Sequence, residues 1–352
     1  MGLRIALIPG DGIGAEVTAA AVRVADAALA PDGLRAEWTS FDWGTDHYLA
    51  HGRTIPEGGL DALRSFDAIL LGAVGDPRVS DTITLSELVF TIRRTFDQYL
   101  NLRPARLWLG VPSPLKSSDT KNIDLLIVRE NTEGEYANVG GRFHAGTPDE
   151  TALQTNVFTR KGCERVIRAA FELARGRRKQ LTSITKSNAQ AFSMTLWDDV
   201  FRGVALKYSD VATESLLVDA AATELVRRPW RFDTIVASNL FGDILSDLSA
   251  AIVGGLGVTP SGNINPERTA PSMFEPVHGS APDIAGKGIA NPIASILSMA
   301  MLLDHVGQSA GARRIELAVG TTLAESRVQT PDLGGISTTE EMTSAVVAAL
   351  AR

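Results

Sequence analysis

The 352-residue chain is predicted to adopt an α/β fold with a largely parallel sheet. Short apolar runs rich in β-branched residues alternate with longer segments that carry helical periodicity. No internal repeat of about 20–50 residues is evident, which argues against a solenoid or a propeller. The length is sufficient for two domains, although no low-complexity linker marks a boundary between them.

The apolar runs and the helical segments define the expected elements in chain order. Strands are expected at residues 4–8, 68–71, 123–128, 181–185, 215–218 and 234–237. Helices are expected at residues 15–29, 85–99, 161–175, 192–207, 220–227, 243–253, 292–305, 313–325 and 339–350. Because the final quarter is rich in helices, these helices should pack on the first sheet.

One segment departs from the alternation. Residues 151–159 are rich in threonine and β-prone, and they follow a glycine-rich stretch at residues 134–146. This composition predicts an antiparallel arm. Such an arm either exchanges strands between two subunits, which would indicate a dimer, or forms an internal hairpin.

Composition excludes several classes of partner. The net charge of −7 argues against nucleic acid or an anionic membrane surface. Cys163 is the single cysteine, so the chain has no intrachain disulfide and no cysteine-based metal site, which suits the reducing cytoplasm. No apolar run approaches about 20 residues, and the first apolar run resembles a strand rather than a signal peptide.

A pair of aspartates provides the first indication of chemistry. Asp243 and Asp247 follow a buried-type strand, and an expected turn at residues 238–242 leads into their helix. The i, i+4 spacing places both carboxylates on one helix face, with Cβ atoms about 5–6 Å apart. A hard divalent cation with oxygen ligands would relieve their repulsion. The alternative is capping of the helix N-terminus, which also favours aspartate.

Two glycine-rich segments could approach a ligand closely. Residues 10–14 (GDGIG) lack the G-x-G-x-x-G spacing of the Rossmann fingerprint, so a tight turn into a helix is favoured over a phosphate site. Residues 275–291 combine small residues with His, Asp, Glu and Asn, which suits a ligand-binding loop. An acidic residue in such a loop could bind ribose hydroxyls and repel a 2′-phosphate. The alternative is a purely structural loop.

Three arginines form a further group. Arg93 lies on an expected helix, Arg103 follows it, and Arg129 ends an apolar strand. Guanidinium groups bind carboxylates with two hydrogen bonds, so converging arginines would hold a di- or tricarboxylate. A lone arginine is usually a surface residue, and Arg94 beside Arg93 shows how weak the single-residue signal is.

Three more polar residues lie near strand ends. Tyr136 follows Arg129 by seven residues, and Lys186 comes just after an expected strand. Both are candidate proton-transfer groups. Asp219 lies at the carboxyl end of an expected strand, where sites of α/β proteins gather. For each alone, an ordinary surface charge is the simpler interpretation.

Together these segments resemble the β-decarboxylating dehydrogenases, the family of isocitrate, 3-isopropylmalate, homoisocitrate and tartrate/D-malate dehydrogenases. The matching motifs are PGDGIG at residues 9–14, NLRP at 101–104, VREN at 128–131, NLFGDILSD at 239–247 and EPVHGSAPDIAG at 275–286. The resemblance implies an isopropylmalate-dehydrogenase-like fold. Its two α/β domains would share a largely parallel sheet, with a cofactor site that is not of the Rossmann type and a β arm for dimerisation. It implies a cofactor-binding domain of residues 1–100 with 255–352. Residues 101–254, with an arm at about 134–160, would form the substrate, metal and dimerisation domain.

The resemblance also implies an activity and its residues. The enzyme would oxidise the hydroxyl of a 2-hydroxy acid, usually with loss of CO2. Arg93, Arg103 and Arg129 would hold the substrate carboxylates. Asp219, Asp243 and Asp247 would bind Mg²⁺ or Mn²⁺, with K⁺ as a candidate monovalent ion. Lys186 would take the hydroxyl proton and Tyr136 would protonate the carbon that loses CO2. In this family Asp219 and Lys186 come from the partner subunit, so the active unit would be a homodimer.

The implied cofactor is NAD, because Asp283 and Ile284 stand where NADP-dependent members carry Lys and Tyr. The residues implied to bind it are Glu275, His278, Gly279, Ser280, Ala281, Asp283, Ile284 and Asn291.

The tartrate/D-malate group is the nearest subfamily. Its pattern is matched by FDWG at residues 41–44, FDQY at 96–99, GVPSPL at 110–115, SITKSN at 183–188 and ASNL at 237–240. The chain departs from this pattern at Ser86-Glu87, where the group has Trp-Gly. Val89 and Phe90 leave 3-isopropylmalate or another substituted malate as the alternative substrate. A non-catalytic regulatory subunit is a remote alternative, because every expected catalytic group is present.

Overall fold

The computed structural model describes residues 2–116 and 123–352. The chain divides into two compact units. Unit 1 comprises Met1–Gln98, Arg103–Ile123 and Ser249–Arg352, and unit 2 comprises Tyr99–Leu102 and Asp124–Leu248. Strand β4 (Leu100–Arg106) has residues in both units, and so does helix α9 (Asn239–Ile252).

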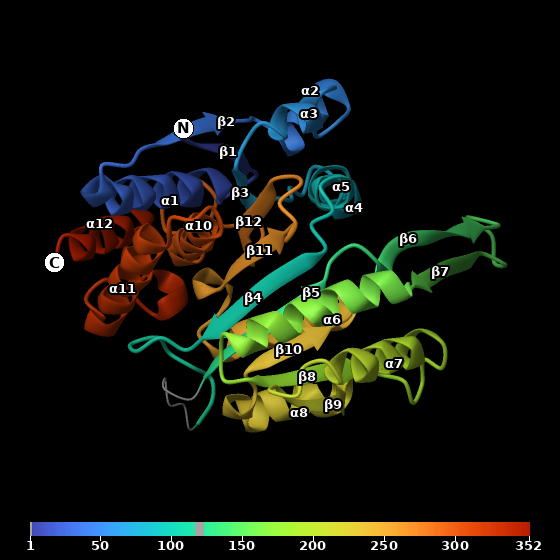
Figure 1. Cartoon of the computed structure of the whole chain (residues 1–352). Helices are drawn as coiled ribbons and strands as arrows, with labels where there is room; N and C mark the ends of the chain where they lie inside the picture. Colours follow the sequence, from blue (N-terminus) through green and yellow to red (C-terminus); the bar gives the residue numbers. More distant parts are fainter. Residues whose placement is uncertain (1, 117–122) are drawn as a thin grey trace. The chain divides into compact units, whose positions relative to one another are not determined.

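Unit 1 contains a five-stranded, mostly parallel arrangement (Figure 1). The strands in spatial order are β2 (Ala36–Ser40), β1 (Leu3–Gly10), β3 (Ala68–Ala73), β12 (Ser272–Pro276) and β11 (Pro260–Ile264). Strands β2, β1, β3 and β12 run parallel, and β11 pairs antiparallel with β12. Every residue of β3 is buried, as expected for a central parallel strand covered on both faces.

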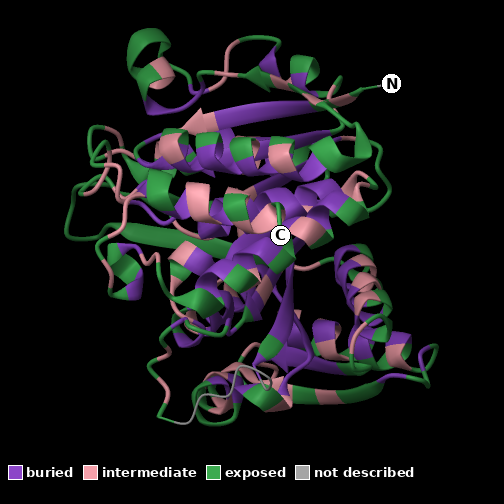
Figure 2. Cartoon of the chain, turned by 90° about the vertical axis from the view of Figure 1, so that its left-hand side faces the viewer, coloured by how far each residue is buried: buried purple, intermediate pink, exposed green. Residues whose placement is uncertain are grey.

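Helices cover the faces of these strands. The longer ones are α1 (Gly14–Leu29), α10 (Ile293–His305), α11 (Ser309–Glu325) and α12 (Thr339–Leu350). Helix α10 lies on β3, β11 and β12, and α1 packs on α10, α11 and α12. Ten of the thirteen residues of α10 are buried, which explains its apolar composition. Figure 2 shows buried residues on the strands and on one side of many helices. The prediction that the C-terminal helices pack on the first sheet is therefore confirmed for α10, whereas α11 and α12 pack on other helices.

Short helices complete unit 1. They are η1 (Ala30–Asp32), α2 (Thr45–His51), α3 (Gly59–Leu63), α4 (Asp81–Thr84), the π-helix η2 (Leu85–Phe90), α5 (Thr91–Thr95), η4 (Leu256–Val258) and η5 (Pro331–Leu333). The helix expected at residues 85–99 therefore begins earlier, contains a π-helical stretch and ends at Thr95. Among the described residues, no helix is both long and apolar enough to cross a membrane.

Unit 2 is built on four parallel strands. Their spatial order is β5 (Asp124–Glu130), β10 (Thr234–Ala237), β8 (Gln180–Thr185) and β9 (Ala212–Leu217). The helices are α6 (Arg160–Arg175), α7 (Ser193–Ala205), α8 (Val218–Arg227) and α9, with the short η3 (Pro229–Arg231). The predicted α/β class with a largely parallel sheet is thus confirmed.

Two boundaries in unit 2 were predicted wrongly. Residues 238–242 are not a turn, because α9 begins at Asn239. Gly242 lies inside this helix, and a Cβ there would come 2.7 Å from the Cβ and Cγ of Arg129. The glycine therefore permits close packing of α9 on β5 rather than a turn. Val218 was expected to end a strand, but it begins α8, so Asp219 lies in the first turn of that helix.

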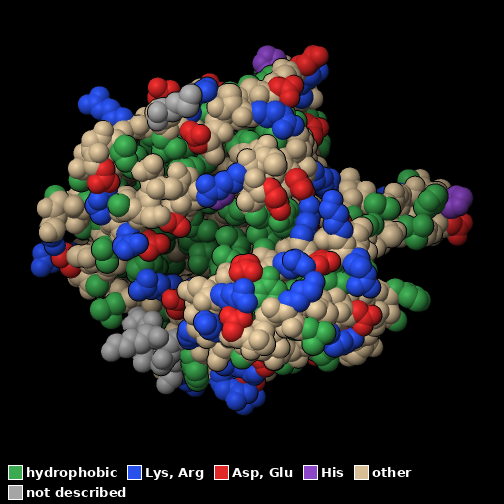
Figure 3. Space-filling view, viewed as in Figure 1, with side chains coloured by type: hydrophobic (Ala, Val, Ile, Leu, Met, Phe, Trp, Pro, Cys, Tyr) green, Lys and Arg blue, Asp and Glu red, His purple; other side chains and the backbone are tan. Residues whose placement is uncertain are grey.

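The expected antiparallel arm is present. Strand β6 (Gly134–Phe143) pairs antiparallel with β7 (Thr151–Val157), and the register shifts between Gly134 and Val139. The apolar side chains of Val139, Phe143 and Leu153 are about half exposed on it. Figure 3 shows hydrophobic side chains on the surface of this arm. Exposed apolar side chains gathered on one element indicate a binding surface.

Candidate active site

In unit 2, four polar side chains from three elements lie together. Arg129 at the end of β5 donates to Asn239 Oδ1 through Nε (2.9 Å) and Nη2 (2.7 Å). Its Nη1 donates to Asp243 Oδ1, and the Tyr136 hydroxyl donates to Asp243 Oδ2 at 3.0 Å. The guanidinium also lies 5.4 Å from the centre of the Tyr136 ring. The structure therefore brings together three residues that the sequence nominated separately.

The electrostatics of this cluster suit a proton donor. Arg129 is only 2% exposed, so its charge needs the anionic partner that Asp243 provides. Burial raises the pKa of Tyr136, and the neighbouring Asp243 carboxylate raises it further. Tyr136 therefore keeps its proton at neutral pH and can act as an acid.

The capping explanation for the aspartate pair does not hold. The first turn of α9 contains no acidic residue, since Asp243 is the fifth residue of the helix and Asp247 the ninth. Asp243 is partly exposed and Asp247 is exposed. Ile244 beside them is 56% exposed, so this face of α9 carries both charge and apolar surface.

Lys186 and Asp219 form a separate pair. Lys186 follows β8, and its Nζ lies 2.5 Å from Asp219 Oδ1 in the first turn of α8. The hydrogen bond from Lys186 lowers the pKa of Asp219. Within the described part of the chain, no three His, Cys, Asp or Glu side chains are gathered to hold a metal ion. One chain therefore does not bring Asp219 together with Asp243 and Asp247.

Unit 1 carries a buried arginine with an unsatisfied donor. Arg93 on α5 is 6% exposed, and its Nη2 lies 2.7 Å from Glu275 Oε1 on β12. Asn263 donates to the same oxygen at 2.7 Å. The Nε of Arg93 is buried and has no hydrogen-bond partner. A buried donor without a partner is costly, which favours a ligand carboxylate here.

The nominated arginines are buried, unlike their sequence neighbour Arg94. Arg103 is 8% exposed and thus also buried, whereas Arg94 is exposed. Glu87, where the chain departs from the tartrate/D-malate pattern, lies in the π-helix and is exposed. The backbone N–H of Thr54 donates to its carboxylate at 3.4 Å.

A cavity of about 420 Å³ lies beside the glycine-rich loop of unit 1. Its lining includes four of the eight residues nominated for the cofactor, which are His278, Ala281, Ile284 and Asn291. Because a carbonyl oxygen can only accept, the contact of His278 Nδ1 with Gly279 O (2.9 Å) places the proton on Nδ1. The buried Nε2 is then an acceptor, and it has no partner. Burial lowers the pKa of His278, so the ring stays neutral.

The other four nominated residues do not line this cavity. Glu275 pairs with Arg93, and Asp283 is exposed on the loop. Ser280 O accepts the backbone N–H of Ile13 at 2.9 Å. A Cβ on Gly12 would lie 2.1 Å from the same oxygen, so this glycine allows the turn to pack against the loop. The GDGIG turn is thus a tight, supporting turn at the start of α1.

Three polar residues near these sites were not predicted from the sequence. Asn239 orients Arg129, Asn263 holds Glu275, and Asp332 lines the cavity while accepting from Asn291 Nδ2 at 2.9 Å. Asn263 and Asn239 are buried, which is unusual for asparagine outside hydrogen-bonded sites. Their positions follow from strand pairing and helix packing, which local sequence patterns do not record.

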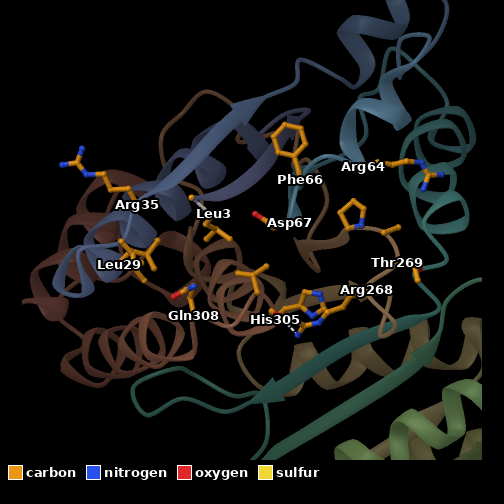
Figure 4. A pocket seen from close by; sticks show the side chains of 15 residues that line it. Leu3, Leu29, Arg35, Arg64, Phe66, Asp67, Arg268, Thr269, His305 and Gln308 are labelled. Carbon is orange, nitrogen blue, oxygen red and sulfur yellow. Dashed lines mark hydrogen bonds between the residues drawn. The ribbon is translucent and has the colours of Figure 1, made fainter.

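A second cavity of unit 1 lies away from the nominated residues (Figure 4). It has a volume of about 480 Å³ and lies where β1 and β3 begin, opposite the strand ends that carry Gly10 and Ala73. The charged ends of Arg35 and Arg64 point away from it on opposite sides. At its wall, Arg268 Nη2 donates to the backbone carbonyl of His305 at 2.7 Å.

His305 predicts a pH dependence of stability. Burial and the Arg268 charge lower its pKa from 6.5 to about 4. The unfolded chain therefore binds the proton first, so stability should fall as the pH drops from about 6.5 towards 4. Because the His305 ring is partly exposed to solvent, we expect the free energy of unfolding to fall by only about 1–2 kcal/mol. Urea unfolding at pH 7.5 and pH 4.5 would measure it.

The matched comparison is His305→Gln against His144→Gln at an exposed position of the arm. His305→Gln should flatten the pH dependence and His144→Gln should not. An unchanged slope in His305→Gln would show that His305 does not carry the effect.

The structure is an α/β fold whose buried Arg93 and Arg129 suit acidic ligands. The chain belongs to the isocitrate/isopropylmalate dehydrogenase family, whose pattern matches residues 4–346. It is 48% identical over 350 residues to a probable tartrate dehydrogenase/decarboxylase of Agrobacterium vitis, covering 99% of this chain and 98% of that protein. A D-malate dehydrogenase (decarboxylating) of Escherichia coli K12 is 48% identical over 353 residues, covering 98% and 97%.

A solved structure agrees with this assignment. The crystal structure of isocitrate dehydrogenase from Methylococcus capsulatus matches with a TM-score of 0.90 and 38% identity, covering 99% of this chain and 100% of that one. The resemblance inferred from the motifs is confirmed, and so is the fold type that it implied.

Proposed function

We propose that the protein oxidises the hydroxyl of a 2-hydroxy dicarboxylic acid of the D-malate or tartrate type. NAD would be the hydride acceptor, a divalent metal ion would assist, and β-decarboxylation would usually follow. The observation that carries this proposal is the Arg129, Asn239, Asp243 and Tyr136 cluster. In it a guanidinium, a carboxylate and a phenol lie within hydrogen-bond distance of one another, which supports a carboxylate-binding group, a metal ligand and an acid in one site. The names of the relatives support the same substrate class.

The acidic residues fit a hard divalent ion. Asp243 and Asp247 offer carboxylate oxygens from one face of α9, which are the ligands that Mg²⁺ and Mn²⁺ prefer. We propose that the partner subunit's Asp219 completes the set, because one chain keeps Asp219 apart from them. Bound metal would supply a Lewis acid for the substrate oxygen, and bound NAD would supply the hydride acceptor.

Side chains of the protein would bind the substrate and transfer the protons. Arg93, Arg103 and Arg129 would hold the substrate carboxylates, and the free Nε of Arg93 is a donor for one of them. Lys186, once separated from Asp219 and in its neutral amine form, would accept the hydroxyl proton. After CO2 leaves, Tyr136 would donate its proton to the carbon that carried the carboxyl group.

The arm supports a homodimer. Its half-exposed Val139, Phe143 and Leu153 are apolar surface that a second copy would bury. We propose that in this dimer Lys186 and Asp219 of one subunit lie in the site of the other. The single cysteine suits the cytoplasmic location that we propose with it.

Residues 275–291 would bind NAD. The acceptor Nε2 of His278 and the apolar lining of the 420 Å³ cavity fit an adenine ring. Asp283 would bind the adenosine ribose and repel a 2′-phosphate. We therefore expect kcat/KM with NAD to exceed that with NADP by at least about tenfold. A preference for NADP would contradict the role of Asp283.

A substrate panel tests the whole proposal. D-malate, both chiral tartrates, meso-tartrate, 3-isopropylmalate and isocitrate would be assayed with NAD and Mn²⁺, with NADH and CO2 measured separately. We expect turnover with D-malate or a tartrate. Exclusive turnover of 3-isopropylmalate would move the assignment to that substrate, which the apolar pair Val89 and Phe90 would explain. No turnover with any of these acids would overturn the proposal.

A further inference from the structure

We infer that Glu135 is a positioning residue that holds the acid Tyr136 and the metal-binding helix α9 in one arrangement. This inference rests on the proposed function and deepens it. Glu135 precedes Tyr136 in β6 and is 7% exposed. Its Oε1 accepts the hydroxyl of Ser238 at 3.0 Å, and its Oε2 accepts the backbone N–H of Leu240 at 3.2 Å.

Both contacts fall at the N-terminus of α9. Ser238 precedes the helix and Leu240 is its second residue, so the carboxylate satisfies one of the N–H groups that a helix start leaves unpaired. The helix dipole favours an anion at this end, which stabilises a buried carboxylate. Glu135 therefore caps α9 from a neighbouring strand.

The irregularity of β6 allows two neighbouring side chains of this strand to contact α9. Neighbouring side chains of a regular strand point to opposite faces. Yet Glu135 and Tyr136 both reach α9, because Tyr136 donates to Asp243 one turn after Leu240. The register shift between Gly134 and Val139 lies at this place, and such bulges re-aim side chains near active sites.

The capped turn also holds the substrate arginine. Asn239 lies between Ser238 and Leu240, and its Oδ1 accepts two donors of Arg129. Glu135 thus fixes the turn that orients Arg129, the helix that carries Asp243 and the strand that carries Tyr136. Loss of this cap should displace all three groups, while the fold keeps its other contacts.

Glu133 offers a matched control two residues earlier. Its carboxylate also holds a helix start, accepting the backbone N–H of Thr159 at 2.9 Å and its hydroxyl at 2.7 Å. Thr159 caps α6, which carries none of the proposed site residues. A general effect of losing a carboxylate at a helix start should therefore appear in both variants, whereas a positioning effect should appear only at Glu135.

The experiment compares Glu135→Ala, Glu135→Gln and Glu133→Ala with the wild type. Mn²⁺ affinity would be measured calorimetrically without substrate, kcat and KM with the best acid of the panel, and the thermal midpoint by circular dichroism. Below its midpoint, Glu135→Ala should lose roughly tenfold or more in kcat/KM and several-fold in Mn²⁺ affinity. Glu133→Ala should stay within about twofold in both, even if its midpoint falls.

Glu135→Gln provides the rescue. Its amide oxygen can accept the N–H of Leu240, and its NH2 can donate to the hydroxyl of Ser238, so both contacts survive. We expect it to recover most of the lost kcat/KM and Mn²⁺ affinity. If Glu135→Ala does not fold, Ser238→Ala removes one of the two contacts and should show a smaller loss in the same direction.

Several outcomes would overturn the inference. They are wild-type kinetics and Mn²⁺ affinity in Glu135→Ala, equal losses in Glu133→Ala, or wild-type values in Ser238→Ala where Glu135→Ala cannot be purified. Failure of the proposed function would look different, because the wild type itself would then turn over no acid of the panel. In that case the difference in Mn²⁺ affinity between Glu135→Ala and Glu133→Ala still decides the role of Glu135. A wild type that binds no Mn²⁺ would overturn both.

Discussion

Asp243→Asn should reduce metal-dependent turnover by roughly 10²–10⁴-fold, because a Lewis-acid metal stabilises the transition state by several kcal/mol. The substitution removes the negative charge that a divalent ion requires, while the amide oxygen can still accept from Arg129 or Tyr136. The fold should survive, because Asp243 is partly exposed and Asn239 still accepts two donors of Arg129. The thermal midpoint should nevertheless fall, because the buried Arg129 loses its anionic partner. Turnover as a function of Mn²⁺ concentration, together with the thermal midpoint, would measure both effects.

Asp210→Asn is the control for this substitution. Asp210 pairs with Arg175 at 2.8 Å in an exposed ion pair of the same unit, and such pairs contribute little to stability. Its turnover should stay within about twofold of the wild type. Undiminished Mn²⁺-dependent turnover in Asp243→Asn would overturn the metal assignment.

The strands that could be predicted from sequence are those that contain a short run rich in apolar or β-branched residues. Residues 234–237 were placed correctly as β10, because all four residues are buried and apolar or β-branched. Strands β11 and β12 were missed because they include polar residues such as Asn263 and Glu275. Asn263 on β11 donates a hydrogen bond to Glu275 on β12. The fold brings these two residues together, so the local sequence does not reveal that they are partners.

In the candidate site, too, the sequence predicted some features and tertiary packing determined the others. Residue types and motif order nominated Arg93, although the sequence alone could not separate it from Arg94. Burial separates the two, and burial depends on tertiary packing. The partner of Arg129 was equally hidden, because Asn239 was assigned to a turn and lies in the first turn of α9. The sequence thus identifies candidate charged residues. Tertiary packing determines which of them are buried and therefore need a partner or a ligand.

Tyr136→Phe should uncouple oxidation from protonation of the product. The phenyl ring can keep its place over Arg129, so substrate binding should change little and KM should stay within about threefold. Loss of the hydroxyl removes the acid, whose raised pKa keeps it protonated at neutral pH. The rate of protonated product formation should therefore fall by about 10²–10⁴-fold.

The measurement follows NADH, CO2 and the final ketone or hydroxy product separately in one reaction. Tyr208→Phe is the matched control, because its hydroxyl donates to Glu172 at 2.8 Å in the same unit and takes no part in the proposed chemistry. If Tyr136→Phe gave the product ratio and rate of the wild type, another group would have to supply the proton. The Asp243 carboxylate accepts from Tyr136 and cannot donate while it is ionised, so the search would then turn to water that reaches the same carbon.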